Sequence, residues 1–269
     1  MIVNTHATFR WRHGLFYAFD YDLMKQLDAD LYVVLVDNID RVQYRMARDG
    51  YTDHTLKDLM VWREEEMLAT ELLAHIVRGH GCFYVFARGV GPGCAEALAR
   101  LICGGPFRTA YLSFPMSHVD GDADSLTEIE RFRTEMKKYF ICFDPGDLEE
   151  KPLTSLALAA AQAGRRHVRV HVDGRDVDIE TSELLAIISD IDGQIYARDF
   201  KLIDSGVERE LQHAHEAAKE VFVIWTSDAT PSPFVTETAT AVFGSVAEAT
   251  RYFMDRGYVP TPGPGGLFG

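Results

Sequence analysis

Two continuous apolar runs, separated by long helical patterns, constrain the fold of this chain more than any other feature. The runs are DLYVVLVDN at residues 30–38 and CFYVFARG at residues 82–89. Runs without alternation are typical of strands that are buried on both faces of a parallel sheet. Parallel strands need a crossover of a dozen or more residues, and the helical patterns between the runs supply it. This order predicts an α/β fold in which helices cover both faces of a parallel sheet.

Helical patterns and a short leading strand fill the rest of the first hundred residues. Residues 38–50 form a helical pattern, and a longer one runs over residues 54–81 until two glycines end it. The arginines that share one face of the first pattern are Arg41, Arg45 and Arg48. Residues 91–105 predict a turn, a helix and a glycine stop. Residues 2–6 predict a short apolar strand that ends in a polar cluster.

The strand and helix pattern starts afresh after the paired glycines that precede residue 106. We expect two three-layer, parallel-sheet α/β domains, at residues 1–105 and 106–259, joined near residues 104–109, and a disordered tail at residues 260–269. The further elements expected are strands at 109–117, 141–147 and 221–227, helices at 125–140, 206–220 and 245–259, a hairpin at 167–179 and a mainly helical stretch at 182–203.

The charge and the cysteines limit the classes of partner and compartment. The chain has 41 acidic and 27 basic residues and a formal net charge of -14, so it should repel nucleic-acid backbones. No apolar run approaches the ~20 residues that span a membrane. The four cysteines show no CxxC spacing, and the chain opens without a signal-peptide pattern, so we expect a cytoplasmic protein without a metal or cofactor.

A first resemblance rests on the order of three stretches within residues 2–103. They read IVNTHATFR, LDADLYVVLVDNIDRVQYRMARD and CFYVFARGVGPGCAEALARLI. In this order they resemble archaeal-type adenylate kinases and related P-loop nucleoside-monophosphate kinases. The resemblance implies a nucleotide site in which arginines neutralise phosphates. The candidate nucleotide-binding residues are Thr5, His6, Arg10, Arg45 and Arg48.

The phosphate-binding loop of that family is missing from the sequence. The pattern G-x-x-x-x-G-K-[ST] does not occur, and Asn4 stands where the family has Asp. We therefore expect no phosphoryl transfer from this chain, which would be a degenerate kinase or a fragment of a longer P-loop kinase fusion. The alternative for the arginines is that they are solvated helix charges, paired with Asp40, Asp49 or the acids at residues 64–66.

A second resemblance covers residues 109–258. The stretches that carry it are YLSFP (111–115), YARDFKLID (196–204) and GVERELQHAHEAAKEVFVI (206–224). They resemble the nucleoside 2-deoxyribosyltransferase-like superfamily, which has a Rossmann-like fold. The resemblance places Glu210 on the nucleophile of that group and Asp199 on its base-contacting aspartate, and Tyr111 is expected to orient the carboxylate.

The chemistry of an N-glycosidic bond explains why such residue types are needed. Cleavage builds positive charge on the sugar, which a carboxylate stabilises or traps covalently, while a second acid serves the leaving base. Asp204 competes with Asp199 for the second role, and Glu208 competes with Glu210 for the first. Alternatively, Glu210 is a first-turn acid that the helix dipole favours.

The sequence thus leaves three hypotheses open. The first is an enzyme of nucleotide metabolism that acts on a nucleoside or nucleotide. The second is a nucleotide-sensing or regulatory protein without catalysis, which Val207 in place of the superfamily's threonine favours. The third is a non-catalytic subunit that assembles through an exposed sheet edge, for example as a homo-oligomer.

Overall fold

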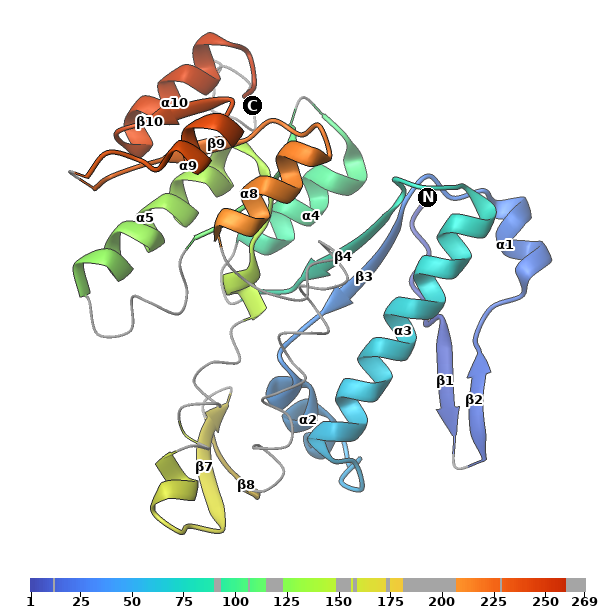
Figure 1. Cartoon of the computed structure of the whole chain (residues 1–269). Coiled ribbons are helices and arrows are strands. Elements are labelled where there is room, and N and C mark those ends of the chain that lie inside the picture. The colour runs from blue at the N-terminus through green and yellow to red at the C-terminus, as the bar shows by residue number, and fades with distance from the viewer. Residues whose placement is uncertain are drawn as a thin grey trace. The chain divides into compact units, whose positions relative to one another are not determined.

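The computed structural model of the 269-residue chain describes residues 1–11, 13–89, 93–105, 107–114, 123–148, 156, 159–172, 175–180, 207–227 and 229–259. They form a mixed α/β structure with small parallel sheets (Figure 1). The chain divides into two compact units, one of residues 1–89 and 146–195 and the other of residues 90–145 and 196–269.

The first unit is built on the parallel pair that the two apolar runs predict. Strand β3 (Tyr32–Val36) pairs in parallel with β4 (Phe83–Ala87), from Tyr32 opposite Phe83 to Val36 opposite Ala87. On one face of the pair, valine side chains pack against Met67 of helix α3 (Leu56–Val77), which is fully buried. The predicted strands, their parallel pairing and the long helix between them are therefore confirmed.

Local signals set the ends of the helices between these strands. Thr55 and Asp58 form a capping box at the start of α3, in which each side chain accepts from the other's backbone N–H. The helix ends before Gly79, whose φ of 89° lies in the left-handed region that favours glycine. Helix α2 (Ile39–Arg48) packs its buried Ile39 against the first turns of α3.

The first twenty residues differ from the prediction. Residues 2–6 are not a strand, and the side chains of Ile2 and Val3 are exposed. The apolar run has no partner strand among the described residues, and pairing begins only at Thr8. There an unpredicted antiparallel hairpin forms from β1 (Thr8–Trp11) and β2 (Gly14–Tyr17). Helix α1 (Tyr21–Leu27) follows.

The hairpin predicted at residues 167–179 is confirmed, but it belongs to the first unit and not to the expected domain of residues 106–259. Strands β7 (His167–Val172) and β8 (Arg175–Glu180) pair antiparallel. Val168 of β7 joins the core that contains Ile39 and Leu56. The mainly helical stretch predicted at residues 182–203 and the tail at residues 260–269 lie outside the described residues.

Among its described residues, the second unit contains two parallel strand pairs. Strand β5 (Thr109–Tyr111) pairs with β6 (Ile141–Phe143), and β9 (Phe222–Ile224) pairs with β10 (Ala241–Phe243). The helices are α4 (Gly93–Cys103), α5 (Ala123–Tyr139), α8 (Val207–Glu216), α9 (Pro233–Thr238) and α10 (Val246–Asp255). A core that includes Leu112, Met136, Phe140, Phe243 and Phe253 lies between strands and helices. The short α9 and β10 were not predicted. The other elements fall within their expected ranges, except that α5 begins two residues before the expected start at residue 125.

Helix α4 belongs to the second unit, although the sequence places the expected joint after it. Its Arg100 is buried, and the guanidinium donates to the backbone oxygen of Lys137 at 3.1 Å and lies 4.2 Å from the ring centroid of Phe107. These contacts connect the helix to α5 and to the segment before β5. The glycines that end this helix indicate where the helix stops, but they do not show which unit it packs in. No helix in the described part of the chain is both long and apolar enough to cross a membrane.

Candidate active site

Three side chains from two distant parts of the sequence meet in the second unit. Glu210 lies on α8, Tyr111 is the last residue of β5, and Ser113 follows two residues later. The hydroxyl of Tyr111 lies 3.4 Å from Oε1 of Glu210 and donates to it. The hydroxyl of Ser113 donates to Oε2. Both oxygens of this carboxylate therefore accept a hydroxyl from the end of β5.

The backbone explains why these residues meet. Extended residues alternate sides, so Tyr111 and Ser113 point the same way while Leu112 between them enters the core, where it is 3% exposed. Glu210 lies in the first turn of α8, which begins at Val207, so the helix dipole favours its negative charge there. The site lies at the carboxyl end of parallel strand β5, the edge at which α/β proteins bind ligands.

Two opposing effects act on the pKa of the Glu210 carboxyl. Burial raises the pKa of the Glu210 carboxyl, while the hydrogen bonds from Ser113 and Tyr111 act to lower it, and the burial effect prevails. The carboxylate is half-buried, so it interacts with a nearby positive charge more strongly than a fully solvated one does. Such a group suits the stabilisation of a developing cation.

A second carboxylate lies at the same edge of this sheet, at the end of β6. The Asp144 side chain is completely buried and accepts from Nε of Arg133 at 2.8 Å, and it lies 2.6 Å from Nζ of Lys137. The guanidinium of Arg133 also lies 5.6 Å from the ring centroid of Phe114. Because two cations compensate Asp144, we assign it a structural role. The sequence analysis missed Asp144 and Ser113, although both lie within the strand ranges that it expected, 141–147 and 109–117.

The second acid that the resemblance implies is not placed. Asp199 and its competitor Asp204 lie outside the described residues, so the described part of the site consists of Glu210 with Tyr111 and Ser113. Of the three predicted catalytic residues, the structure brings two together.

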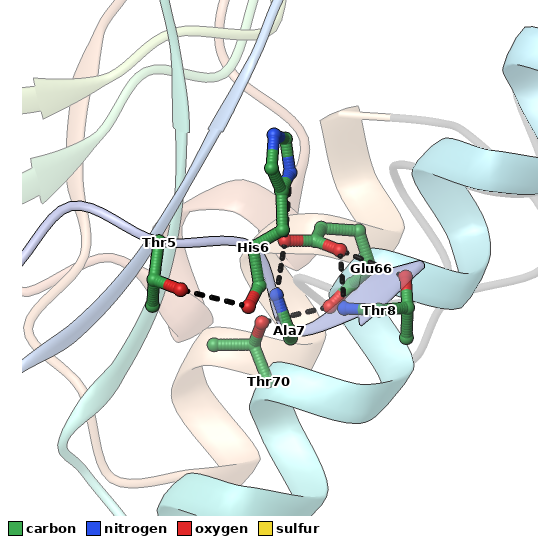
Figure 2. Close-up of polar contacts among 6 residues, drawn as sticks. All are labelled: Thr5, His6, Ala7, Thr8, Glu66 and Thr70. Atoms are coloured by element: carbon green, nitrogen blue, oxygen red, sulfur yellow. Dashed lines mark hydrogen bonds and ion pairs between the residues drawn. The ribbon is translucent and has the colours of Figure 1, made fainter. Parts of the chain in front are cut away.

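In the first unit, the predicted Thr5 and His6 lie on an exposed segment beside α3 (Figure 2). The Thr5 hydroxyl donates to the backbone oxygen of His6 at 3.2 Å. Nδ1 of His6 lies 3.6 Å from Oε1 of Glu66, and the Glu66 carboxylate accepts the backbone N–H groups of Ala7 at 2.7 Å and Thr8 at 3.0 Å. Glu66 thus fixes the backbone that leads into β1.

Each of the three predicted arginines pairs with a carboxylate. Arg10 pairs with Glu65, Arg45 with Asp37 at 2.8 Å, and Arg48 with Asp49 at 2.9 Å. The alternative named in the sequence analysis, in which the arginines pair with neighbouring acids, therefore describes Arg10 and Arg48.

Arg45 has a different setting from the other two arginines. Its partner Asp37 directly follows β3 and also accepts from Arg88, which directly follows β4, at 3.1 Å. Two guanidinium groups thus meet one carboxylate at the carboxyl ends of the parallel pair. The sequence analysis named neither Asp37 nor Arg88. The described residues contain no group of three or more His, Cys, Asp or Glu side chains that could hold a metal ion.

Comparison with protein-family models, with curated proteins and with solved structures finds no match to this chain. The geometry around Glu210 is therefore the strongest indication of function in this chain.

Proposed function

We propose that the second unit cleaves or exchanges the N-glycosidic bond of a nucleoside or nucleotide, with Glu210 as the nucleophile or charge stabiliser. The observation that carries this proposal is the half-buried Glu210 carboxylate held by the hydroxyls of Tyr111 and Ser113. The finer fold that goes with it is a Rossmann-like three-layer unit, beside an incomplete P-loop-kinase-like first unit. The superfamily resemblance of residues 109–258 supports both statements.

The proposed step uses the carboxylate where positive charge develops. As the bond from the sugar to the base breaks, the bonding electrons leave with the base and the sugar carbon becomes cationic. Glu210 either faces this cation or bonds to it. Water or a second base then attacks the sugar carbon, and any bond between that carbon and Glu210 breaks, so that the carboxylate is released. Hydroxyl donors that already hold both carboxylate oxygens reduce the reorganisation that the step requires. Asp199 is the proposed acid that serves the leaving base.

A nucleotide-binding role for the first unit is the companion proposal. Among the candidate residues, Arg45 has the strongest support, because it lies with Arg88 at the carboxyl ends of parallel strands. For Thr5 and His6 the support is their sequence resemblance alone. Arg10 and Arg48 form ion pairs with neighbouring acids, which supports a structural role for them.

Binding without catalysis is the second candidate function. This function is favoured by the hydrogen bonds to both Glu210 oxygens, because a carboxylate that accepts two hydroxyl hydrogen bonds is a weaker nucleophile than one that accepts none. In that case the same side chains would recognise the sugar of a nucleotide and leave its bond intact.

One assay separates the two functions. The purified chain is incubated with a panel of deoxynucleosides and nucleoside monophosphates, and free base is measured by chromatography while binding is measured by calorimetry. Release of free base by the wild type, with binding but no release by Glu210→Gln, supports catalysis. Binding without release by the wild type supports the sensing function. Failure to bind any of these compounds contradicts both.

A further inference from the structure

The β1–β2 hairpin carries three aromatic side chains on one face. The register places Phe9 opposite Phe16 and Trp11 opposite Gly14, and residues opposite or two apart share a face. We call the side chains Phe9, Trp11 and Phe16 the aromatic face. They are exposed by 56%, 75% and 51%.

On the other face of the hairpin, two side chains of β1 contact helix α3. Thr8 donates its hydroxyl to Glu66 at 2.9 Å, and Arg10 donates to Glu65 at 2.9 Å from Nε, so this face meets α3 (Figure 1). The aromatic face therefore points away from the helix that anchors the hairpin. Large exposed apolar groups of this kind mark interaction sites in folded proteins.

The hairpin also has open edges. In the described part of the chain, β1 and β2 pair only with each other, so each is an edge strand. Isolated two-stranded sheets are marginally stable in water and gain from further pairing or from coverage of one face.

The distribution of charge indicates what covers the aromatic face. Residues 1–19 contain no Asp or Glu, whereas the whole chain has a net charge of -14. Two copies of an acidic protein repel each other over most of their surface, and this repulsion is weakest where acids are missing. Arg10 forms an ion pair with Glu65, while Arg12, in the turn of the hairpin, lies outside the described residues.

We propose that the aromatic face of the hairpin is the contact between two copies of this chain. A two-fold axis through the contact brings the same patch of both copies together, as in most homodimers. Tryptophan is among the residue types that dominate the energy of such contacts, so Trp11 is the central anchor.

Sedimentation velocity of the full-length chain over a range of micromolar concentrations tests this proposal. We expect the wild type to convert from one to two copies as its concentration rises. Trp11→Ser should weaken the dimer by about 30-fold or more, the effect of losing a dominant contact residue. Phe16→Ser, on the same face, should act in the same direction.

Tyr17→Ser is the matched control, because Tyr17 is 77% exposed and lies opposite Thr8 on the face that meets α3. It should leave the dimer unchanged, and far-ultraviolet circular dichroism should show that all three variants remain folded. A wild type that stays monomeric at every concentration overturns the proposal. So does equal weakening by Trp11→Ser and Tyr17→Ser, or a monomer that instead binds a single-stranded oligonucleotide or lipid vesicles through Trp11.

Discussion

The hydroxyl of Tyr111 donates to Oε1 of Glu210 across 99 positions of sequence, at a distance of 3.4 Å. The two residues come from a strand and a helix that share one unit of the fold, and Ser113 completes the contact on the other carboxylate oxygen. The proposed chemistry is therefore assigned to the Glu210 carboxylate, and the first predictions concern this one side chain.

Glu210→Gln should reduce base release by at least ~100-fold, because it keeps the shape of the side chain and removes the charge that faces the sugar cation. Glu216→Gln is the matched control on the same helix. Glu216 is exposed and accepts from Gln212 at 2.6 Å, so its replacement should leave the rate within about twofold of the wild type. Equal losses in the two variants would contradict the assignment of Glu210. Free base measured over time is the readout.

Ser113→Ala should move the acidic limb of the pH profile of kcat/KM to higher pH. The Ser113 hydroxyl stabilises the charged form of Glu210, so its loss raises the pKa of that carboxyl further. Ser113→Thr keeps a hydroxyl and should restore the profile. A uniform loss of rate at every pH, without a shift of the limb, would show that Ser113 does not act on the charge of Glu210.

Glu210→Gln should also be at least as stable as the wild type at neutral pH. Burial raises the pKa of Glu210 in the folded state above its value in the unfolded chain, so the folded state binds the proton more tightly. The resulting stability is present below the unfolded pKa of about 4.3 and is lost as the pH rises through the folded pKa. Urea unfolding at neutral and acidic pH measures this. The difference in the free energy of unfolding between Glu210→Gln and the wild type should become smaller at acidic pH.

Asp144→Ala should lower the free energy of unfolding by about 3–5 kcal/mol, because it leaves the charges of Arg133 and Lys137 without their buried partner. Glu130→Ala removes an exposed partner of the same Arg133 and should cost less than about 1 kcal/mol. Urea unfolding of both variants gives the comparison. Similar small losses would show that Asp144 is more solvated than its burial indicates.

Glu66→Ala should release the backbone at the entry to β1. Hydrogen bonds to a charged group contribute about 1.5–3 kcal/mol, and Glu66 accepts the N–H groups of both Ala7 and Thr8. The amide exchange of these two residues should accelerate while that of β3 and β4 is preserved. Arg48→Ala, which breaks an exposed ion pair with Asp49, should leave the exchange at Ala7 unchanged.

Long and strongly patterned elements could be read from the sequence because their signals are local. The runs at residues 30–38 and 82–89 predict β3 and β4 and their parallel pairing, since a buried strand needs an unbroken apolar stretch. The helical pattern at residues 54–81, ended by two glycines, predicts α3 and its end before Gly79. The expected strand at residues 2–6 was wrong because apolar composition alone supplies no partner strand.

The pairing of Tyr111 with Glu210 could be anticipated only through the superfamily resemblance, which names residue types at given positions. Ser113 and Asp144 could not be identified, because a polar residue after a strand has the same appearance whether it binds a ligand, a carboxylate or water. The same limit applies to Arg45 and Arg88, whose common partner Asp37 emerges only when β3 and β4 lie side by side.

The sequence by itself determined the α/β class, the acidic surface and most of the helices and strands, because these depend on composition and on periodicities within one segment. The tertiary structure decided which charges are compensated. It buried Asp144 between two cations, left the Glu210 carboxylate half-buried against two hydroxyls, and turned the aromatic face of the hairpin toward solvent. These outcomes depend on which distant segments share a surface, because burial and hydrogen bonding set the cost of a charge.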